Sequence, residues 1–199
     1  MKELLNSYKP LKEKIISRLN DFKILKEEDQ FKELLFCLLT PQSNAQRCWQ
    51  AVELLSKLPK LTNPEVLEIL KTKTRFHNTK SLRILKAEET WKVIKPLLNN
   101  PNRLELRNQI SEIVNGYGLK EAGHFLRNIG KSDNQIAILD RHILRNLEKY
   151  QVISEEKIKG QKHYKKIESL FLDFAKQNNI PADHLDLLWW SQENGEIFK

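Results

Sequence analysis

Apolar residues recur with the period of an α-helix along almost the whole chain, and this pattern limits the fold more than any other feature. Segments with this period are residues 11–19, 31–39, 47–58, 64–71, 79–98, 102–114, 120–129, 140–150 and 156–177. No stretch alternates apolar and polar residues strictly enough to require a β-strand. Because 40% of the 199 residues are hydrophobic and glycine and proline are scarce, the chain is typical of an ordered globular protein. The sequence predicts an all-α fold with short loops.

The charge of the chain favours a polyanionic partner. The formal net charge is +8 at pH 7, and lysine and arginine gain affinity for nucleic acids by displacing counterions from phosphates. A solvated, lysine-rich surface explains the same composition without any partner.

Cysteine usage and hydropathy exclude several classes of protein. Cys37 and Cys48 are the only cysteines, too few for a four-cysteine iron–sulfur or zinc site, and they do not suggest a disulfide scaffold. The N-terminal stretch lacks the apolar core of a signal peptide, and no apolar run approaches membrane-spanning length. We therefore expect a cytoplasmic protein that has no membrane contact and needs no metal.

Two glycines lie between helical patterns in the segment "NGYGLKEAGHFLRN", residues 115–128. Gly116 and Gly118 flank Tyr117, and four of the six glycines fall between residues 116 and 130. Glycines at this point permit a tight turn with positive φ and a close backbone approach to a ligand. The N–H groups that begin the second helix would form an anion site, while Tyr117 can turn inward. The pattern resembles a helix-hairpin-helix that binds a DNA phosphate, although an ordinary tight helix connection has the same glycines.

Lys120 lies in the first turn of the helix after this hairpin. The positive end of the helix dipole and partial burial both disfavour an ammonium group there, as an amine nucleophile requires. A phosphate-contacting or simple surface lysine is the alternative.

Asp140 precedes a further helical pattern and is expected to cap it. A second hairpin helix of about 10 residues spans roughly 15 Å, and the chain from Gly130 to Asp140 can return that distance. An ionised aspartate aimed at a lysine amine can orient it and stabilise positive charge on a sugar. Capping and catalysis are compatible.

Taken together, "GYGLKEAGHFLRNIG" and "AILDRHILRNL" resemble the helix-hairpin-helix superfamily of DNA glycosylases. They are most similar to the compact archaeal and bacterial 8-oxoguanine DNA glycosylase/AP lyases of the second Ogg type, and the similarity extends over nearly the whole chain. The resemblance implies two helical subdomains with the active-site cleft between them. One is a helical barrel at about residues 30–130 that ends in the hairpin at residues 105–130, and the other combines about residues 1–29 with 131–199.

The resemblance also assigns catalytic and phosphate-binding residues. Lys120 matches the lysine that attacks C1′ of the damaged nucleoside, and Asp140 matches the aspartate that assists it. Gly116 and Gly118 match the hairpin glycines, where such proteins often hold a monovalent cation as well. His142 matches a residue near the DNA backbone, with a structural histidine as the alternative.

Two further segments are similar to DNA-contacting loops of the family. In "LLTPQSNAQRCW", Gln42 matches the wedge that fills the space left by an extruded base, and Asn44 and Arg47 become candidates for reading the orphaned base. In "TRFHNTK", Phe76 matches an aromatic residue that lies against the opposite strand, although core packing is an alternative.

The C-terminal segment "DLLWWSQENGEIFK" is similar to one that folds back into the base pocket of the family. Trp190 and Lys199 become candidates for stacking on the flipped base and for hydrogen bonding to it, whereas Trp189 is expected in the core. The sequence departs from the pattern of the glycosylase family at two points. It has no C-terminal cysteines, which excludes the branch of the family that holds an iron–sulfur cluster. It also has Gly123 where close relatives tend to have a serine.

The expected activity is therefore base-excision repair of duplex DNA that contains 8-oxoguanine, by a bifunctional N-glycosylase and AP lyase acting as a monomer without a cofactor. A glycosylase/lyase for another damaged base is one alternative. A non-catalytic helix-hairpin-helix DNA-binding module is another, but it would not need Lys120 and Asp140 together. A helical bundle for protein interaction leaves the glycine pair and the charge unexplained.

Overall fold

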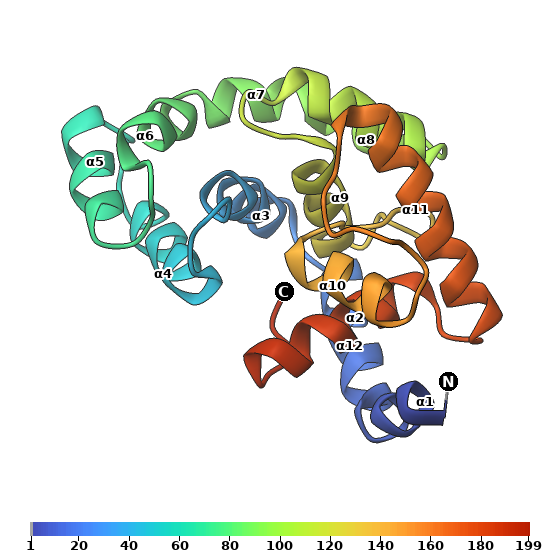
Figure 1. Ribbon diagram of the computed structural model, residues 1–199. Coiled ribbons are helices and arrows are strands. Elements are labelled where there is room, and N and C mark those ends of the chain that lie inside the picture. The colour runs from blue at the N-terminus through green and yellow to red at the C-terminus, as the bar shows by residue number, and fades with distance from the viewer. Residues whose placement is uncertain (1) are drawn as a thin grey trace. The chain divides into compact units, whose positions relative to one another are not determined.

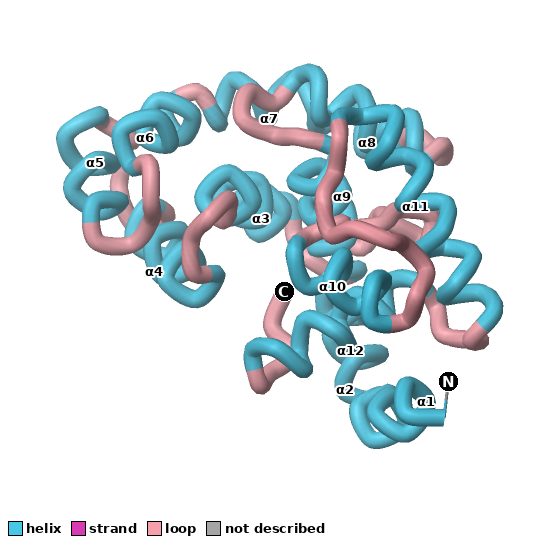
Figure 2. The backbone as a smooth tube through the Cα atoms, in the orientation of Figure 1, coloured by secondary structure: helices cyan, strands magenta, loops and turns pink. Residues whose placement is uncertain are grey.

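The computed structural model describes residues 2–199, which form α-helices, two short 3₁₀ helices and loops (Figure 2). Within this range there is no β-strand, so the predicted all-α fold is confirmed. None of the helices in the described range combines the length and the hydropathy that a membrane span needs. The chain divides into two compact units: Leu25–Phe125 is one, and Leu126–Lys199 with the N-terminal segment ending at Ile24 is the other.

The unit Leu25–Phe125 is built around α3. Its elements are α3 (Glu27–Leu39), α4 (Ala45–Leu55), α5 (Asn63–Lys71), α6 (His77–Leu85), α7 (Ala87–Ile94), η2 (Lys95–Asn99), α8 (Arg103–Ile113) and the beginning of α9 (Leu119–Asn128). In Figure 1, α4 to α8 follow one another around α3. The side chains of residues 33–39 are all buried, which is the pattern of a helix surrounded by other elements.

The other unit is built around α12. It contains α1 (Lys2–Tyr8), η1 (Lys9–Leu11), α2 (Lys12–Lys23), the end of α9, α10 (Arg141–Lys149), α11 (Gly160–Gln177) and α12 (Ala182–Asn194). Helix α12 packs against α2, α10 and α11, and Figure 1 shows it beside α2 and α10. Trp189 is fully buried and stacks on Tyr150 with 5.9 Å between the ring centres. The expectation that Trp189 belongs to the core is confirmed.

Two helical patterns of the sequence differ from the observed helices. The single pattern at residues 79–98 is divided among α6, α7 and η2, with a break after Leu85. The pattern at residues 156–177 becomes helical only from Gly160. In the first pattern, apolar periodicity continues through the break because α6, α7 and η2 each have buried residues. In the second, only the start of the helix differs, and helix ends are the part of a helix that a sequence pattern defines least well.

Candidate active site

The hairpin between α8 and α9 occupies residues 114–118. Gly116 has φ of +100°, the left-handed region that favours glycine. A Cβ atom at Gly116 would lie 2.6 Å from the guanidinium group of Arg83, so that side chain would have to move. Tyr117 is 8% exposed, and its hydroxyl donates a hydrogen bond of 2.9 Å to the carbonyl of Leu34 in α3. The expected inward orientation of Tyr117 is confirmed, and it anchors the turn to the centre of its unit.

Gly118, unlike Gly116, does not have a positive φ. Its N–H group donates a hydrogen bond of 3.0 Å to Glu121 Oε2. This is the half of a capping box in which a glutamate in the first turn reaches back to the residue before the helix. A carboxylate therefore lies at the positive end of the α9 dipole, where negative charge is favoured.

Lys120 lies in the first turn of α9, and its side chain is 30% exposed. Its Nζ atom forms an ion pair of 2.9 Å with Glu121 Oε1. The same glutamate thus contacts the hairpin backbone through one oxygen and the lysine through the other. This carboxylate stabilises a positive charge on Lys120, in opposition to the helix dipole.

Asp140 caps α10, as the sequence predicts. Its Oδ1 atom accepts hydrogen bonds from the N–H groups of His142, at 2.8 Å, and Ile143, at 2.9 Å. Its Oδ2 atom accepts no hydrogen bond from the described part of the chain. In the first turn of α10, His142 Nδ1 lies 3.4 Å from Glu193 Oε2 on α12. Asp140 and His142 belong to one unit, and Lys120 belongs to the other.

The loop from Thr40 to Asn44 connects α3 to α4 and presents Gln42. Gln42 is exposed and has φ of +54°, which is uncommon for a residue with a side chain. Asn44 caps α4, since its Oδ1 atom accepts a hydrogen bond of 3.0 Å from the N–H group of Arg47. The side chain of Arg47 lies on the surface at the first turn of α4.

Phe76 precedes α6, and its side chain is 54% exposed. The core-packing alternative for this residue is therefore wrong. Its φ of +56° is again left-handed, and the guanidinium carbon of Arg75 lies 5.3 Å from the centre of its ring. Gln42 and Phe76 lie in the same unit, each at the surface and each with an unfavourable backbone conformation.

Sequence reasoning missed a residue beneath these two loops. Lys80 on α6 is 1% exposed, and its Nζ atom donates a hydrogen bond of 2.7 Å to the carbonyl of Leu39. The signal was present in the sequence: Lys80 shares a helix face with buried Ile84, four residues later, where an apolar side chain is expected. A lysine on the apolar side of a helix is rarely buried without partners.

The C-terminal segment follows Gly195, whose φ of +81° ends α12 in a left-handed turn. The ring of Phe198 then lies 6.3 Å from that of Trp190, centre to centre. The carbonyl of Phe198 accepts a hydrogen bond of 2.6 Å from Arg18 Nε. Trp190 is partly exposed and Lys199 is 5% exposed. The end of the chain is thus folded back onto α12 and α2.

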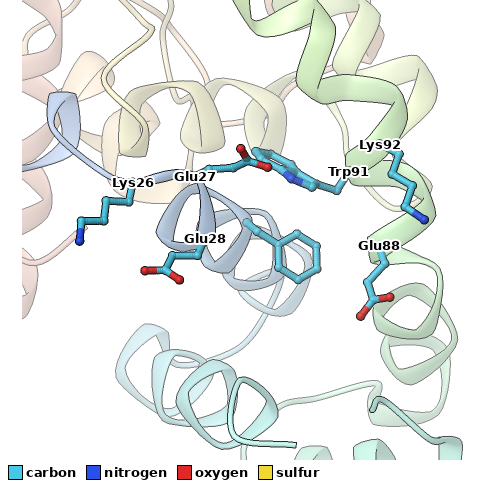
Figure 3. A pocket seen from close by; sticks show the side chains of 7 residues that line it. Lys26, Glu27, Glu28, Glu88, Trp91 and Lys92 are labelled. Carbon is cyan, nitrogen blue, oxygen red and sulfur yellow. The ribbon is translucent and has the colours of Figure 1, made fainter. Parts of the chain in front are cut away.

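A cavity of about 550 Å³ in the unit Leu25–Phe125 lies apart from these residues (Figure 3). None of the predicted site residues lines it; its lining is Lys26, Glu27, Glu28, Phe31, Glu88, Trp91 and Lys92. The centres of the rings of Phe31 and Trp91, two of the lining residues, lie 5.9 Å apart.

Potential metal ligands are dispersed. Among residues 2–199, no group of three or more histidine, cysteine, aspartate or glutamate side chains is arranged to hold a metal ion. Cys37 and Cys48 are buried free thiols, and burial raises the pKa of Cys48 to about 11.

Comparison with known sequences and structures identifies the family of this chain. The family model Ogg-HhH, described as 8-oxoguanine DNA glycosylase, matches residues 15–180. A Fusobacterium nucleatum protein named 8-oxoguanine DNA glycosylase/AP lyase is 40% identical over 99% of this chain and 96% of its own length. A protein of the same name from Picrophilus torridus is 33% identical over 93% of this chain and 90% of its own length.

Two solved structures share the fold over the whole chain. The 8-oxoguanine DNA glycosylase of Thermotoga maritima has a TM-score of 0.89 at 28% identity, covering 100% of this chain and 97% of that one. The Methanocaldococcus jannaschii 8-oxoguanine glycosylase/lyase, in complex with a 15mer DNA containing 8-oxoguanine, has a TM-score of 0.85 at 31% identity, covering 100% of both chains. This chain therefore belongs to the helix-hairpin-helix family of 8-oxoguanine DNA glycosylases.

Proposed function

We propose that this protein excises 8-oxoguanine from duplex DNA and then cleaves the strand, as a bifunctional N-glycosylase and AP lyase in base-excision repair. The observation that carries the proposal is the position of Lys120. A partly exposed lysine amine lies in the first turn of α9, directly after the Gly116 turn, in a chain of the 8-oxoguanine DNA glycosylase family.

In the proposed reaction, the amine of Lys120 attacks C1′ of the damaged nucleoside. The C1′–N bond breaks, and the base leaves with the bonding electrons and takes up a proton. The sugar ring opens to give a protonated imine on Lys120. Loss of a proton from C2′ then expels the 3′-phosphate by β-elimination, and hydrolysis of the imine restores the lysine. Neither step needs a metal or an organic cofactor.

Asp140 has one oxygen available for this reaction. Its Oδ1 atom is engaged by two backbone N–H groups of α10, which holds the carboxylate in a single orientation. We assign Oδ2 to the positive charge that develops on the sugar.

Several other residues are proposed to hold the DNA. The Gly116–Gly118 turn would contact a backbone phosphate, with a monovalent cation as an optional structural ligand, and His142 would lie near the backbone. Gln42 and Phe76 would enter the duplex, with Asn44 and Arg47 at the orphaned base. Trp190 and Lys199 would contact the flipped base.

The DNA partner is also supported by the charge and by a relative. A net charge of +8 suits counterion release from phosphates, and the Methanocaldococcus jannaschii protein was solved with DNA containing 8-oxoguanine. The buried free thiols are compatible with action on DNA in the reducing cytoplasm. A monomer suffices, because both proposed catalytic residues belong to one chain.

Borohydride trapping tests this proposal. The wild-type protein is incubated with a duplex containing one 8-oxoguanine opposite cytosine, and the covalent adduct is measured beside that of Lys120→Gln. The matched control is Lys92→Gln, which removes an exposed lysine from α7 in the same unit. We expect an adduct with the wild type and with Lys92→Gln, and none with Lys120→Gln.

Other results would change the assignment. An adduct on an abasic-site duplex but not on the 8-oxoguanine duplex would support the lyase activity and would show that the damaged base is not 8-oxoguanine. Binding of both duplexes without any adduct would indicate a non-catalytic DNA-binding module.

A further inference from the structure

The side chain of Lys80 is enclosed by four oxygen atoms. Its Nζ atom lies 2.7 Å from the Leu39 carbonyl, 2.8 Å from the Pro41 carbonyl, 3.0 Å from Ser43 Oγ and 2.7 Å from Thr74 Oγ1. All these partners belong to the unit that contains Lys80. The residue Lys80 as a whole is 1% exposed, so these contacts replace the hydration of its amine.

The four oxygens come from two loops that are distant in the sequence. Leu39, Pro41 and Ser43 belong to the end of α3 and the loop before α4, whereas Thr74 belongs to the loop between α5 and α6. The loops are also joined directly: Ser43 Oγ lies 2.8 Å from Thr74 Oγ1 and accepts a hydrogen bond of 3.0 Å from the N–H group of Arg75. Lys80 and the two hydroxyl groups therefore tie the loops together.

Each of these loops presents one exposed residue with a left-handed backbone. Gln42, with φ of +54°, lies between the Pro41 carbonyl and Ser43, both of which contact Lys80. Phe76, with φ of +56°, directly follows Arg75. The carbonyl of Phe76 accepts a hydrogen bond of 3.0 Å from the backbone N–H group of Lys80. Side-chain-bearing residues persist in this conformation only where the surrounding structure enforces it, and such positions cluster at functional sites.

Stability alone does not account for a buried lysine at this position. A buried charge loses its hydration, and apolar side chains of similar volume are often equally stable or better there. Burial is the main cause that lowers the pKa of Lys80 to about 8. The positive charges of Arg83, Arg75 and Lys120 lower this pKa further, whereas Cys48 raises it. The ammonium form, with its three donors, still predominates at pH 7. The lysine thus supplies hydrogen bonds to two loops that an apolar residue would leave unconnected.

We propose that Lys80 is a positioning residue that holds the Gln42 loop and the Phe76 loop as one rigid element, so that both exposed side chains enter the DNA duplex together. The proposal rests on the function proposed above, in which these two residues open the base stack. It adds a buried residue that contacts no DNA and acts only through the two loops.

The test compares Lys80→Met with Lys71→Met, which removes the same charge from an exposed site on neighbouring α5. Excision of 8-oxoguanine is followed in single turnover with saturating enzyme. Opening of the stack is followed by the fluorescence of 2-aminopurine placed beside the lesion. Imine formation is measured separately, by borohydride trapping on an abasic-site duplex that has no base pair to open.

We expect Lys80→Met to slow excision about tenfold or more and to abolish most of the 2-aminopurine signal. Trapping on the abasic duplex should stay close to that of the wild type, because Lys120 is unchanged. Lys71→Met should resemble the wild type in all three measurements. Equal losses in excision and in abasic trapping would overturn the proposal, since they would show general damage to the fold.

A double-mutant cycle adds a readout that a merely structural lysine would not change. In the background Gln42→Ala/Phe76→Ala, Lys80→Met should have little further effect on excision, because the residues through which it acts are gone. The full effect of Lys80→Met in that background would overturn the proposal. If Lys80→Met does not fold, Ser43→Ala/Thr74→Val removes the two hydroxyl groups from the network while Lys80 is kept, and the same results are expected.

Failure of the proposed function gives a different pattern. If the wild type does not excise 8-oxoguanine, the 2-aminopurine signal on the 8-oxoguanine duplex still decides about Lys80, because opening of the base stack precedes and does not require excision. A signal in the wild type that is lost in Lys80→Met supports the positioning role, and a signal retained in the variant overturns it. Absence of the signal in the wild type overturns both proposals.

Discussion

At the scale of single residues, Glu121 has two tasks at the start of α9. Its Oε2 atom accepts a hydrogen bond from the N–H group of Gly118, and its Oε1 atom forms an ion pair with Lys120. The first contact stabilises the hairpin, and the second stabilises the ammonium form of the proposed nucleophile. Imine formation requires the uncharged amine. The Glu121 carboxylate therefore holds Lys120 in place but lowers the reactivity of its amine.

Replacement of the glutamate by glutamine separates these two tasks. Glu121→Gln keeps an oxygen that can accept the Gly118 N–H group, but it removes the negative charge beside Lys120. We expect the rate of imine formation to rise at the acidic end of its pH profile, which should move to lower pH, since less energy is then needed to deprotonate the amine. The measurement is the rate of borohydride trapping on an abasic duplex between pH 5 and 9. Glu105→Gln, an exposed position on α8, is the control, and an unchanged profile in Glu121→Gln would contradict the assignment.

At the scale of secondary-structure elements, helix N-termini set the position of most candidate residues. Asn44 caps α4, Asp140 caps α10, and Glu121 closes the first turn of α9. A capping side chain is held by backbone N–H groups and so has few orientations. The proposed site is therefore placed by local helix geometry within each unit.

Two substitutions at Asp140 distinguish capping from catalysis. Asp140→Asn keeps an oxygen for the N–H groups of His142 and Ile143, so the free energy of unfolding should change by no more than about 0.5 kcal/mol. The same variant removes the charge and should lower the excision rate by a factor on the order of 10² or more. Asp140→Ala should lose the activity and also about 1 kcal/mol of stability. Urea unfolding and single-turnover excision give the two quantities, and an active Asp140→Asn would show that the aspartate serves only as a cap.

At the scale of the whole molecule, the unit that contains α12 has a charged pair in its interior. Arg127 Nη2 lies 3.3 Å from Asp186 Oδ2, and both side chains are almost fully buried. The indole ring of Trp189 lies on the same helix as Asp186. Burial raises the pKa of Asp186 to about 7; Arg127 opposes this, and the charges of Asp140 and Asp183 contribute to it. The carboxyl group therefore binds a proton more tightly in the folded protein than in the unfolded chain.

This shift predicts how stability depends on pH. Because the folded pKa of Asp186 is raised, its contribution to stability is present at acidic pH and is lost as the pH rises through about 7. Asp186→Asn, which resembles the protonated form, should lack this loss. The difference in unfolding free energy between Asp186→Asn and the wild type should thus move by about 3 kcal/mol in favour of the variant between pH 5 and 8. Urea unfolding at several pH values measures it, and a constant difference would show that Asp186 stays ionised across this range.

The sequence by itself determined the features that depend on a few neighbouring residues. Helical periodicity predicted the all-α fold, the glycine pair predicted the turn before α9, and Asp140 was predicted to cap α10. These features follow from contacts within about four residues along the chain, which the sequence displays directly. The resemblance to the family carried the expected chemistry, which the family match supports.

Only the tertiary structure decided the features that depend on packing between distant segments. It placed Lys80 against oxygens up to 41 residues away in the chain, exposed Phe76, and divided the helical pattern at residues 79–98. No local rule names the partner of a buried charge, because that partner is whichever oxygen the folded chain brings within reach. For the same reason the sequence identified Gln42 and Phe76 as separate candidates, whereas the structure joins their loops through one buried amine.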